Sequence, residues 1–155
     1  MTACITGWAH TRFGRLDGED SESLIVRVVR EAIADANLEA EAIDAIYLGT
    51  FNAGMSPQEF PGALVLQADD ALRFKPVTRV ENACATGSAA VYQGANLIDA
   101  GRARFVLVVG VEKMTTSPPA EVGPILMKAS YMKEECEPGC GFVDVFGQIA
   151  TTYFD

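Results

Sequence analysis

The stretch Val80-Glu81-Asn82-Ala83-Cys84-Ala85-Thr86-Gly87-Ser88-Ala89-Ala90 joins two segments of different pattern. Residues 76–80 before it predict a strand, and residues 85–100 after it predict a helix that ends at Gly101. Cys84 is therefore expected where a strand turns into a helix. Backbone N–H groups at a helix start have no intrahelical acceptor, and the helix dipole is positive there, so this position favours a thiolate.

The predicted helix behind Cys84 has no charged residue between positions 82 and 98, and most of its surface is small. A helix that is uncharged all round is normally buried all round. We therefore expect this helix in the middle of a layered fold. Cys84 itself has two interpretations at this point: a nucleophile aimed out of the top of a sheet, or a small buried hydrophobe.

Further strands and helices alternate around this centre. Residues 24–36 carry an apolar stripe at helical spacing, with Asp20 or Ser21 as the N-cap and Asn37 as a left-handed end. The continuous apolar run 104–111 is typical of a parallel strand covered on both faces. Strands at 3–9 (with Cys4 in the core) and 43–51, and a helix at 61–72, complete the order βαβαβαβ. This order predicts an α/β fold with a mostly parallel sheet.

The regular pattern ends at about residue 115, where prolines and glycines become frequent. We expect an α/β core over residues 1–114 and an incomplete lid or loop region over 115–155, with short helices near 122–132 and 143–153. Cys136 and Cys140 lie in this second region. Two thiols without two further ligands make a poor zinc site, so we expect no metal.

The composition excludes several classes of protein. A net charge of −9 argues against nucleic acid and anionic membranes as partners. The longest apolar run is far shorter than the roughly 20 residues that span a bilayer. No signal peptide is visible, and four cysteines in such a chain do not indicate a disulfide framework. The sequence predicts a soluble, cytoplasmic protein.

Two segments resemble one known family. Residues 81–90 resemble the nucleophile segment of thiolases, and Val108-Val109-Gly110-Val111-Glu112-Lys113-Met114 resembles the strand and turn that follow it. The Glu-Lys-Met ending is most similar to sterol-carrier-protein-type thiolases and to their bacterial and archaeal acetyl-CoA acetyltransferase relatives. The resemblance covers essentially the whole chain. It implies a thiolase-like layered fold, of which this sequence matches the N-terminal half and the start of a lid.

The resemblance also implies a chemistry. Cys84 would attack an acyl-CoA thioester and form an acyl-enzyme, with the Cys84 backbone N–H as an oxyanion donor. The reaction would be a Claisen condensation or a thiolysis, with coenzyme A thioesters as substrates and no other cofactor. The family's activating histidine and second catalytic cysteine belong to a second half whose motifs do not occur here. We therefore expect residues 1–155 alone to be inactive and to expose an apolar patch along helix 85–100.

The resemblance further implies a homodimer that pairs the strand at about 77–83 across a two-fold axis. Two other groups of residues remain open. Arg73, Lys75 and Arg79 could steer the phosphates of coenzyme A, although solvated side chains explain them more simply. His10, the only histidine, could be a base but has no evident orienting partner. Alternative functions are a ketoacyl synthase, a hydroxymethylglutaryl-CoA synthase-like enzyme, or a non-catalytic truncated or assembly subunit.

Overall fold

The computed structural model describes residues 2–135 and 141–154 and divides the chain into two compact units, Met1–Lys113 and Met114–Asp155. Cys136 and Cys140 lie outside the described residues. The first unit holds a three-stranded parallel sheet in the order β2-β1-β3. Its strands are β1 (Ala45–Gly49), β2 (Val77–Val80) and β3 (Val106–Gly110). The α/β class predicted from the sequence is confirmed.

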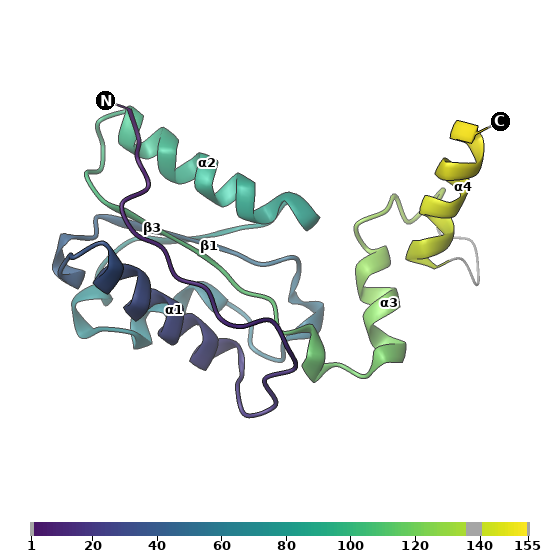
Figure 1. Cartoon of the computed structure of the whole chain (residues 1–155), viewed down its shortest axis with the longest axis horizontal. Helices are drawn as coiled ribbons and strands as arrows, with labels where there is room; N and C mark the ends of the chain where they lie inside the picture. Colours follow the sequence, from purple (N-terminus) through teal and green to yellow (C-terminus); the bar gives the residue numbers. More distant parts are fainter. Residues whose placement is uncertain (1, 136–140, 155) are drawn as a thin grey trace. The chain divides into compact units, whose positions relative to one another are not determined.

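Helices cover both faces of this sheet (Figure 1). Helix α1 (Ser21–Asp35) packs on one face, together with the 3-10 segment Pro61–Gln67. Helix α2 (Thr86–Asp99) packs on the other face, mainly against β1 and β3. The result is a three-layer unit in which the strands are covered on both sides, as the continuous apolar run of β3 predicts.

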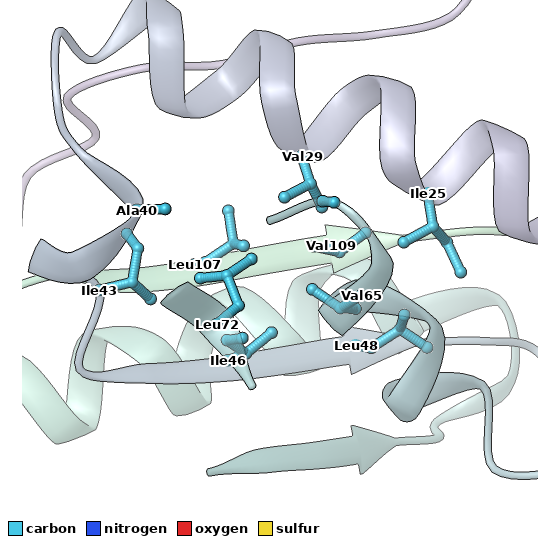
Figure 2. Close-up of a cluster of buried hydrophobic side chains, with 11 residues drawn as sticks. Ile25, Val29, Ala40, Ile43, Ile46, Leu48, Val65, Leu72, Leu107 and Val109 are labelled. Carbon is cyan, nitrogen blue, oxygen red and sulfur yellow. The ribbon is translucent and has the colours of Figure 1, made fainter. Parts of the chain in front are cut away.

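The core lies between α1 and the sheet (Figure 2). Ile25 and Val29 of α1 face the apolar side chains of the strands and are fully buried. At about 25 cal/mol per Å² of apolar surface, each such side chain stabilises the fold by roughly 1.5–3 kcal/mol. The other buried members of this cluster come from the strands and the 3-10 segments: Ala40, Ile43, Ile46, Leu48, Val65, Ala68, Leu72, Leu107 and Val109.

The ends of α1 confirm the predicted caps. The Asp20 carboxylate accepts the Ser23 N–H at 2.8 Å, and the Ser23 hydroxyl accepts the Asp20 N–H at 2.9 Å, which forms a capping box. The Ser23 hydrogen bonds hold the pKa of Asp20 below its usual value. Asn37, just beyond the helix, has a left-handed φ of 51°. This local chemistry fixes where the helix starts and stops.

The predicted first strand at 3–9 is wrong, and with it the predicted core position of Cys4, which is exposed. This segment bonds to helix ends instead of to a sheet edge. The Ala3 N–H donates to Asp99 at 3.0 Å, and the Trp8 N–H donates to Asp35 at 2.9 Å. The predicted helix at 61–72 is also corrected, because it consists of two 3-10 segments, Pro61–Gln67 and Asp70–Leu72.

The second unit contains α3 (Pro119–Met127) and α4 (Phe142–Phe154), which correspond to the two short helices expected there. Helix α3 begins earlier than predicted because Pro119 occupies its first turn, where the missing N–H costs nothing. Within residues 2–135 and 141–154, no helix is long and apolar enough to cross a membrane.

Candidate active site

Cys84 lies in the 3-10 turn Ala83–Ala85, which connects β2 to α2. The side chain is exposed. Ala83, immediately before it, has a φ of 45°, a left-handed conformation that costs a residue with a Cβ about 1–3 kcal/mol. Such a conformation persists only where the surroundings hold it. The turn that presents Cys84 is therefore held in place by neighbouring groups.

Two side chains hold this turn: the Glu81 carboxylate, which accepts the Ala83 N–H at 2.7 Å, and the hydroxyl of Thr86. The Thr86 hydroxyl accepts the Asn82 N–H at 2.8 Å and donates to the Ala83 carbonyl at 2.7 Å. The Thr50 carbonyl lies 3.4 Å from the same oxygen and is an alternative acceptor for its single proton. Thr86 is only 6% exposed, so water does not replace these partners. The two short bonds bracket residues 82–83, which include the strained Ala83.

The methyl group of Thr86 sits against Gly49, the last residue of the central strand. A Cβ built on Gly49 would lie 2.6 Å from Thr86 Cγ2, closer than side chains tolerate. Gly49 pairs with Val80 of β2 and with Gly110 of β3, so it cannot easily move away. The absence of a side chain at Gly49 thus lets the start of α2 approach the sheet closely.

A polar cluster surrounds the residues that follow β1. Arg79 donates from Nε to the Thr50 hydroxyl at 3.0 Å, and its Nη1 lies 4.0 Å from a Glu59 carboxylate oxygen. Glu112 accepts the Phe51 N–H at 2.8 Å. Thr50, Arg79 and Glu112 are among the residues that line a cavity of about 20 Å³, which is the size of one water molecule.

Glu112 has an altered acidity in this cluster. Burial of its carboxyl raises its pKa, and the hydrogen bond from Phe51 and the positive charge of Arg79 oppose that rise without cancelling it. The residue as a whole is exposed, but its side chain lines the small cavity, where hydration of the charge is incomplete.

The next residue, Lys113, is buried and binds the N-terminal loop. Its ammonium group donates to the carbonyls of Arg15 and Leu16. The Glu-Lys pair after β3 therefore has two structural roles in this unit, one toward the loop after β1 and one toward the N-terminal loop. In the sequence, Glu112 and Lys113 indicated only a family resemblance, and neither structural role was predicted.

The other sequence candidates lie apart from this arrangement of contacts. His10 is exposed and contacts the ring of Phe13 in a tilted arrangement, with ring centres 4.8 Å apart and planes inclined by 54°. Arg73 pairs with Asp70 at 2.7 Å, and Lys75 donates to the Glu41 carbonyl at 2.8 Å. Each cation of the group 73, 75 and 79 thus has a partner within the first unit, whether or not it also meets a ligand.

Two further observations concern sites elsewhere. The described ranges 2–135 and 141–154 contain no cluster of three His, Cys, Asp or Glu side chains that could hold a metal ion. A larger hollow of about 700 Å³ lies within the second unit, and Cys84 is not among its lining residues. That hollow is lined by two carboxylates and one side of α4: Glu134, Glu135, Val145, Gln148, Ile149, Thr152 and Tyr153.

The sequence model of the thiolase N-terminal domain matches residues 3–152. The chain belongs to the thiolase family. Among relatives of this thiolase-family chain, the acetyl-CoA acetyltransferase of Methanocaldococcus jannaschii is 34% identical over 149 residues, which are 96% of this chain and 38% of that protein. The family resemblance seen in the nucleophile segment is therefore confirmed.

Two more proteins show how far the similarity extends. The β-ketoacyl-[acyl-carrier-protein] synthase III of Ruegeria pomeroyi is 34% identical over 112 residues, 68% of this chain and 34% of that protein. The structure of an acetyl-CoA acetyltransferase from Syntrophomonas wolfei superposes on 74% of this chain and 29% of its own, with a TM-score of 0.63 at 24% identity, which shows a shared fold. This thiolase-family chain thus spans little more than a third of the relatives that it matches.

Proposed function

We propose that this chain carries the nucleophile of an acyl-CoA acyltransferase of the acetyl-CoA C-acetyltransferase type. Cys84 is the proposed nucleophile, and an acyl-cysteine is the proposed intermediate. The observation that carries the proposal is the placement of an exposed cysteine in a strained turn at the start of α2, in a chain of the thiolase family. Strain of this kind concentrates at functional sites.

The proposed first step is transfer of an acyl group to sulfur. The Cys84 thiolate attacks the thioester carbonyl and forms a C–S bond, and the C–S bond to coenzyme A breaks. Coenzyme A leaves as a thiolate and takes up a proton. The backbone N–H of Cys84 lies before the first full turn of α2, where acceptors within the helix are missing, and is the proposed donor to the oxyanion.

The second step distinguishes the two enzymatic candidates. In the thiolase reaction the acyl-cysteine is attacked by the carbanion of acetyl-CoA. In the reverse direction Cys84 attacks the 3-keto carbon of a 3-ketoacyl-CoA, the bond between C2 and C3 breaks, acetyl-CoA leaves as a carbanion that takes up a proton, and coenzyme A then attacks the acyl-cysteine. The similarity to a β-ketoacyl-[acyl-carrier-protein] synthase III keeps a related condensing enzyme as the second candidate. The acceptor tells them apart, because a synthase would require a decarboxylating malonyl thioester on a carrier protein.

We also propose that a second α/β half covers the outer face of α2 and supplies the acid/base groups. Within the first unit α2 buries only the face formed by Thr86, Ala90 and Gly94. Val91 and Tyr92 are 48% and 66% exposed on a helix whose one charged residue is its last, Asp99. An apolar surface of this kind marks an interaction site.

A homodimer is proposed at the edge of the sheet that β2 forms. In the order β2-β1-β3, strand β2 lies at an edge, where it can pair with the same strand of a second copy. Sedimentation that finds only monomers of the full protein would contradict this pairing. A cytoplasmic location is proposed as well, since Cys4 and Cys84 are both free thiols.

The proposal is tested by intact mass of the full protein before and after incubation with acetyl-CoA. We expect the mass to rise by one acetyl group, with peptide mapping placing the group on Cys84. The Cys84→Ala variant should show no increase, and the Cys4→Ala variant should acylate like the unmodified protein. Acylation that persists in Cys84→Ala, or that maps to Cys4, would refute the assignment. No acylation of Cys84 by acetyl-CoA would favour a non-catalytic subunit.

A further inference from the structure

We infer that Thr86 is the positioning residue of Cys84, and that Gly49, at the end of the central strand, leaves the space in which the Thr86 methyl group packs. The inference rests on the proposed function of Cys84, since positioning has a purpose only if that thiol reacts. It assigns to Thr86 no contact with substrate. Thr86 acts on the turn that carries the nucleophile.

The two short hydrogen bonds of the Thr86 hydroxyl lie on either side of the strained residue. One goes to the N–H of Asn82 and the other to the carbonyl of Ala83, at 2.8 and 2.7 Å. The two backbone groups enclose the residue whose φ is 45°. Removing the hydroxyl therefore removes two bonds that oppose relaxation of Ala83 to an ordinary conformation, while the Ala83 N–H keeps its bond to the Glu81 carboxylate at 2.7 Å.

A second feature is the anchorage of Thr86 itself. Its methyl group occupies the space that a Cβ on Gly49 would need, and its hydroxyl lies 3.4 Å from the carbonyl of Thr50. Both neighbours are at the carboxyl end of β1, the strand paired on both sides. The turn of Cys84 is thus anchored to the central strand of the sheet and not to the solvent-exposed part of α2.

A third feature separates this role from ordinary helix capping. An N-cap hydroxyl bonds forward to N–H groups inside its own helix. The Thr86 hydroxyl bonds backward, to groups of residues 82 and 83 that precede the cysteine. The hydroxyl acts on the preceding turn. Its loss should therefore change the reactivity of Cys84 more than the stability of α2.

The test compares Thr86→Val, which keeps the shape and loses the hydroxyl, with Thr86→Ser, which keeps the hydroxyl. The readout is the rate at which iodoacetamide alkylates Cys84 in the full chain across a series of pH values, with Cys4 as the internal reference. We expect Thr86→Val to lower the Cys84 rate roughly five- to thirtyfold, the factors that the loss of one or of both hydrogen bonds implies at about 1 kcal/mol each. The Cys4 rate should not change, and Thr86→Ser should stay within about twofold of the unmodified chain on the same scale.

A rescue variant makes the test specific to positioning. Glycine adopts a positive φ without the Cβ penalty. Ala83→Gly in the Thr86→Val background should therefore recover most of the Cys84 rate. A purely structural role for Thr86 predicts no such rescue. Equal Cys84 rates in Thr86→Val and the unmodified chain, or a parallel fall at Cys4, would overturn the inference.

Folding of the variants and acylation of Cys84 provide two further tests of the positioning role. If Thr86→Val fails to fold, Thr86→Ala and Thr86→Ser are compared in its place. Should both hydroxyl-free variants unfold while Thr86→Ser stays folded, the hydroxyl serves the whole fold and the positioning role is refuted. If the alkylation pattern follows the expectation but acetyl-CoA never acylates Cys84, Thr86 positions the thiol and the proposed function alone is wrong.

Discussion

Replacing Gly49 by alanine places a methyl group where the start of α2 meets the central strand. The added Cβ would lie 2.6 Å from Thr86 Cγ2, whereas carbon atoms in contact are normally about 3.5–4.0 Å apart. Its next neighbours, the Thr86 carbonyl oxygen and Ala90 Cβ, are at ordinary distances of 3.5 and 3.7 Å. The Thr86 methyl group is therefore the single serious obstacle to a side chain at position 49.

The expected cost follows from this geometry. Overpacking of a well-packed site costs about 1–3 kcal/mol, and alanine returns roughly 0.4–1 kcal/mol by restricting the unfolded chain. We expect Gly49→Ala to lower the free energy of unfolding by about 1–2 kcal/mol. Thr86→Ser alone should cost about 1 kcal/mol for one buried methyl group. In the double variant the new methyl group fills the space of the lost one. The loss of unfolding free energy in the double variant should therefore be smaller than the sum of the two single losses by at least about 1 kcal/mol.

The assay is urea unfolding of the four proteins in the cycle, with m-values compared to exclude changes in the unfolded state. Gly110→Ala is the matched control, because Gly110 ends the neighbouring strand and a Cβ there would meet nothing within 4 Å. It should change the free energy of unfolding by no more than about 0.5 kcal/mol. If the effects of Gly49→Ala and Thr86→Ser on the free energy of unfolding add within about 0.5 kcal/mol, the proposed packing of the Thr86 methyl group against Gly49 is refuted.

Two carboxylates should make stability depend on pH with opposite signs. Glu112 has a raised pKa, so its protonated form favours the fold and that contribution is lost as pH rises through the folded pKa. Glu112→Gln should therefore gain stability relative to the unmodified chain between acidic and neutral pH, measured by urea unfolding at each pH. Asp44 has a pKa lowered by the N–H groups of Phe105 and Arg104, so its contribution is present above the usual aspartate pKa and is lost on acidification. Asp44→Asn should be destabilised at neutral pH and approach the unmodified chain as pH falls through the folded pKa; slopes of the same sign for both variants would contradict these assignments.

Local signals in the sequence predicted the parts of the fold that depend on near neighbours. Asp20 and Asn37 bound α1 through contacts within a few residues, so their roles were visible in the chain, whereas the part of Ser23 in the capping box was not predicted. The uninterrupted apolar run of β3 needed only the rule that such strands are covered on both faces. The same local reasoning placed Cys84 between a strand and a helix, where the structure has it.

Partners distant in sequence explain what local signals missed. The segment at 3–9 has strand-like composition, but the hydrogen bonds that hold it come from Asp99 and Asp35, 96 and 27 residues away. The sequence predicted no role for Thr86, although it lies in the quoted segment 81–90, because Gly49, the residue that its methyl group packs against, belongs to another strand. A glycine at a strand end has several possible reasons, and only the contact with Thr86 shows which one applies here.

The end of β1 links the two sides of the candidate site. Gly49 and the Thr50 carbonyl meet Thr86 and the turn of Cys84, while the Thr50 hydroxyl and the Phe51 N–H meet Arg79 and Glu112. All of these contacts are made within the first unit, on the sheet side of α2. A partner that covers the outer face of α2 could therefore add acid/base groups without reshaping the Cys84 turn. In the proposed mechanism this chain supplies the geometry around Cys84, and the covering half supplies the acid/base groups.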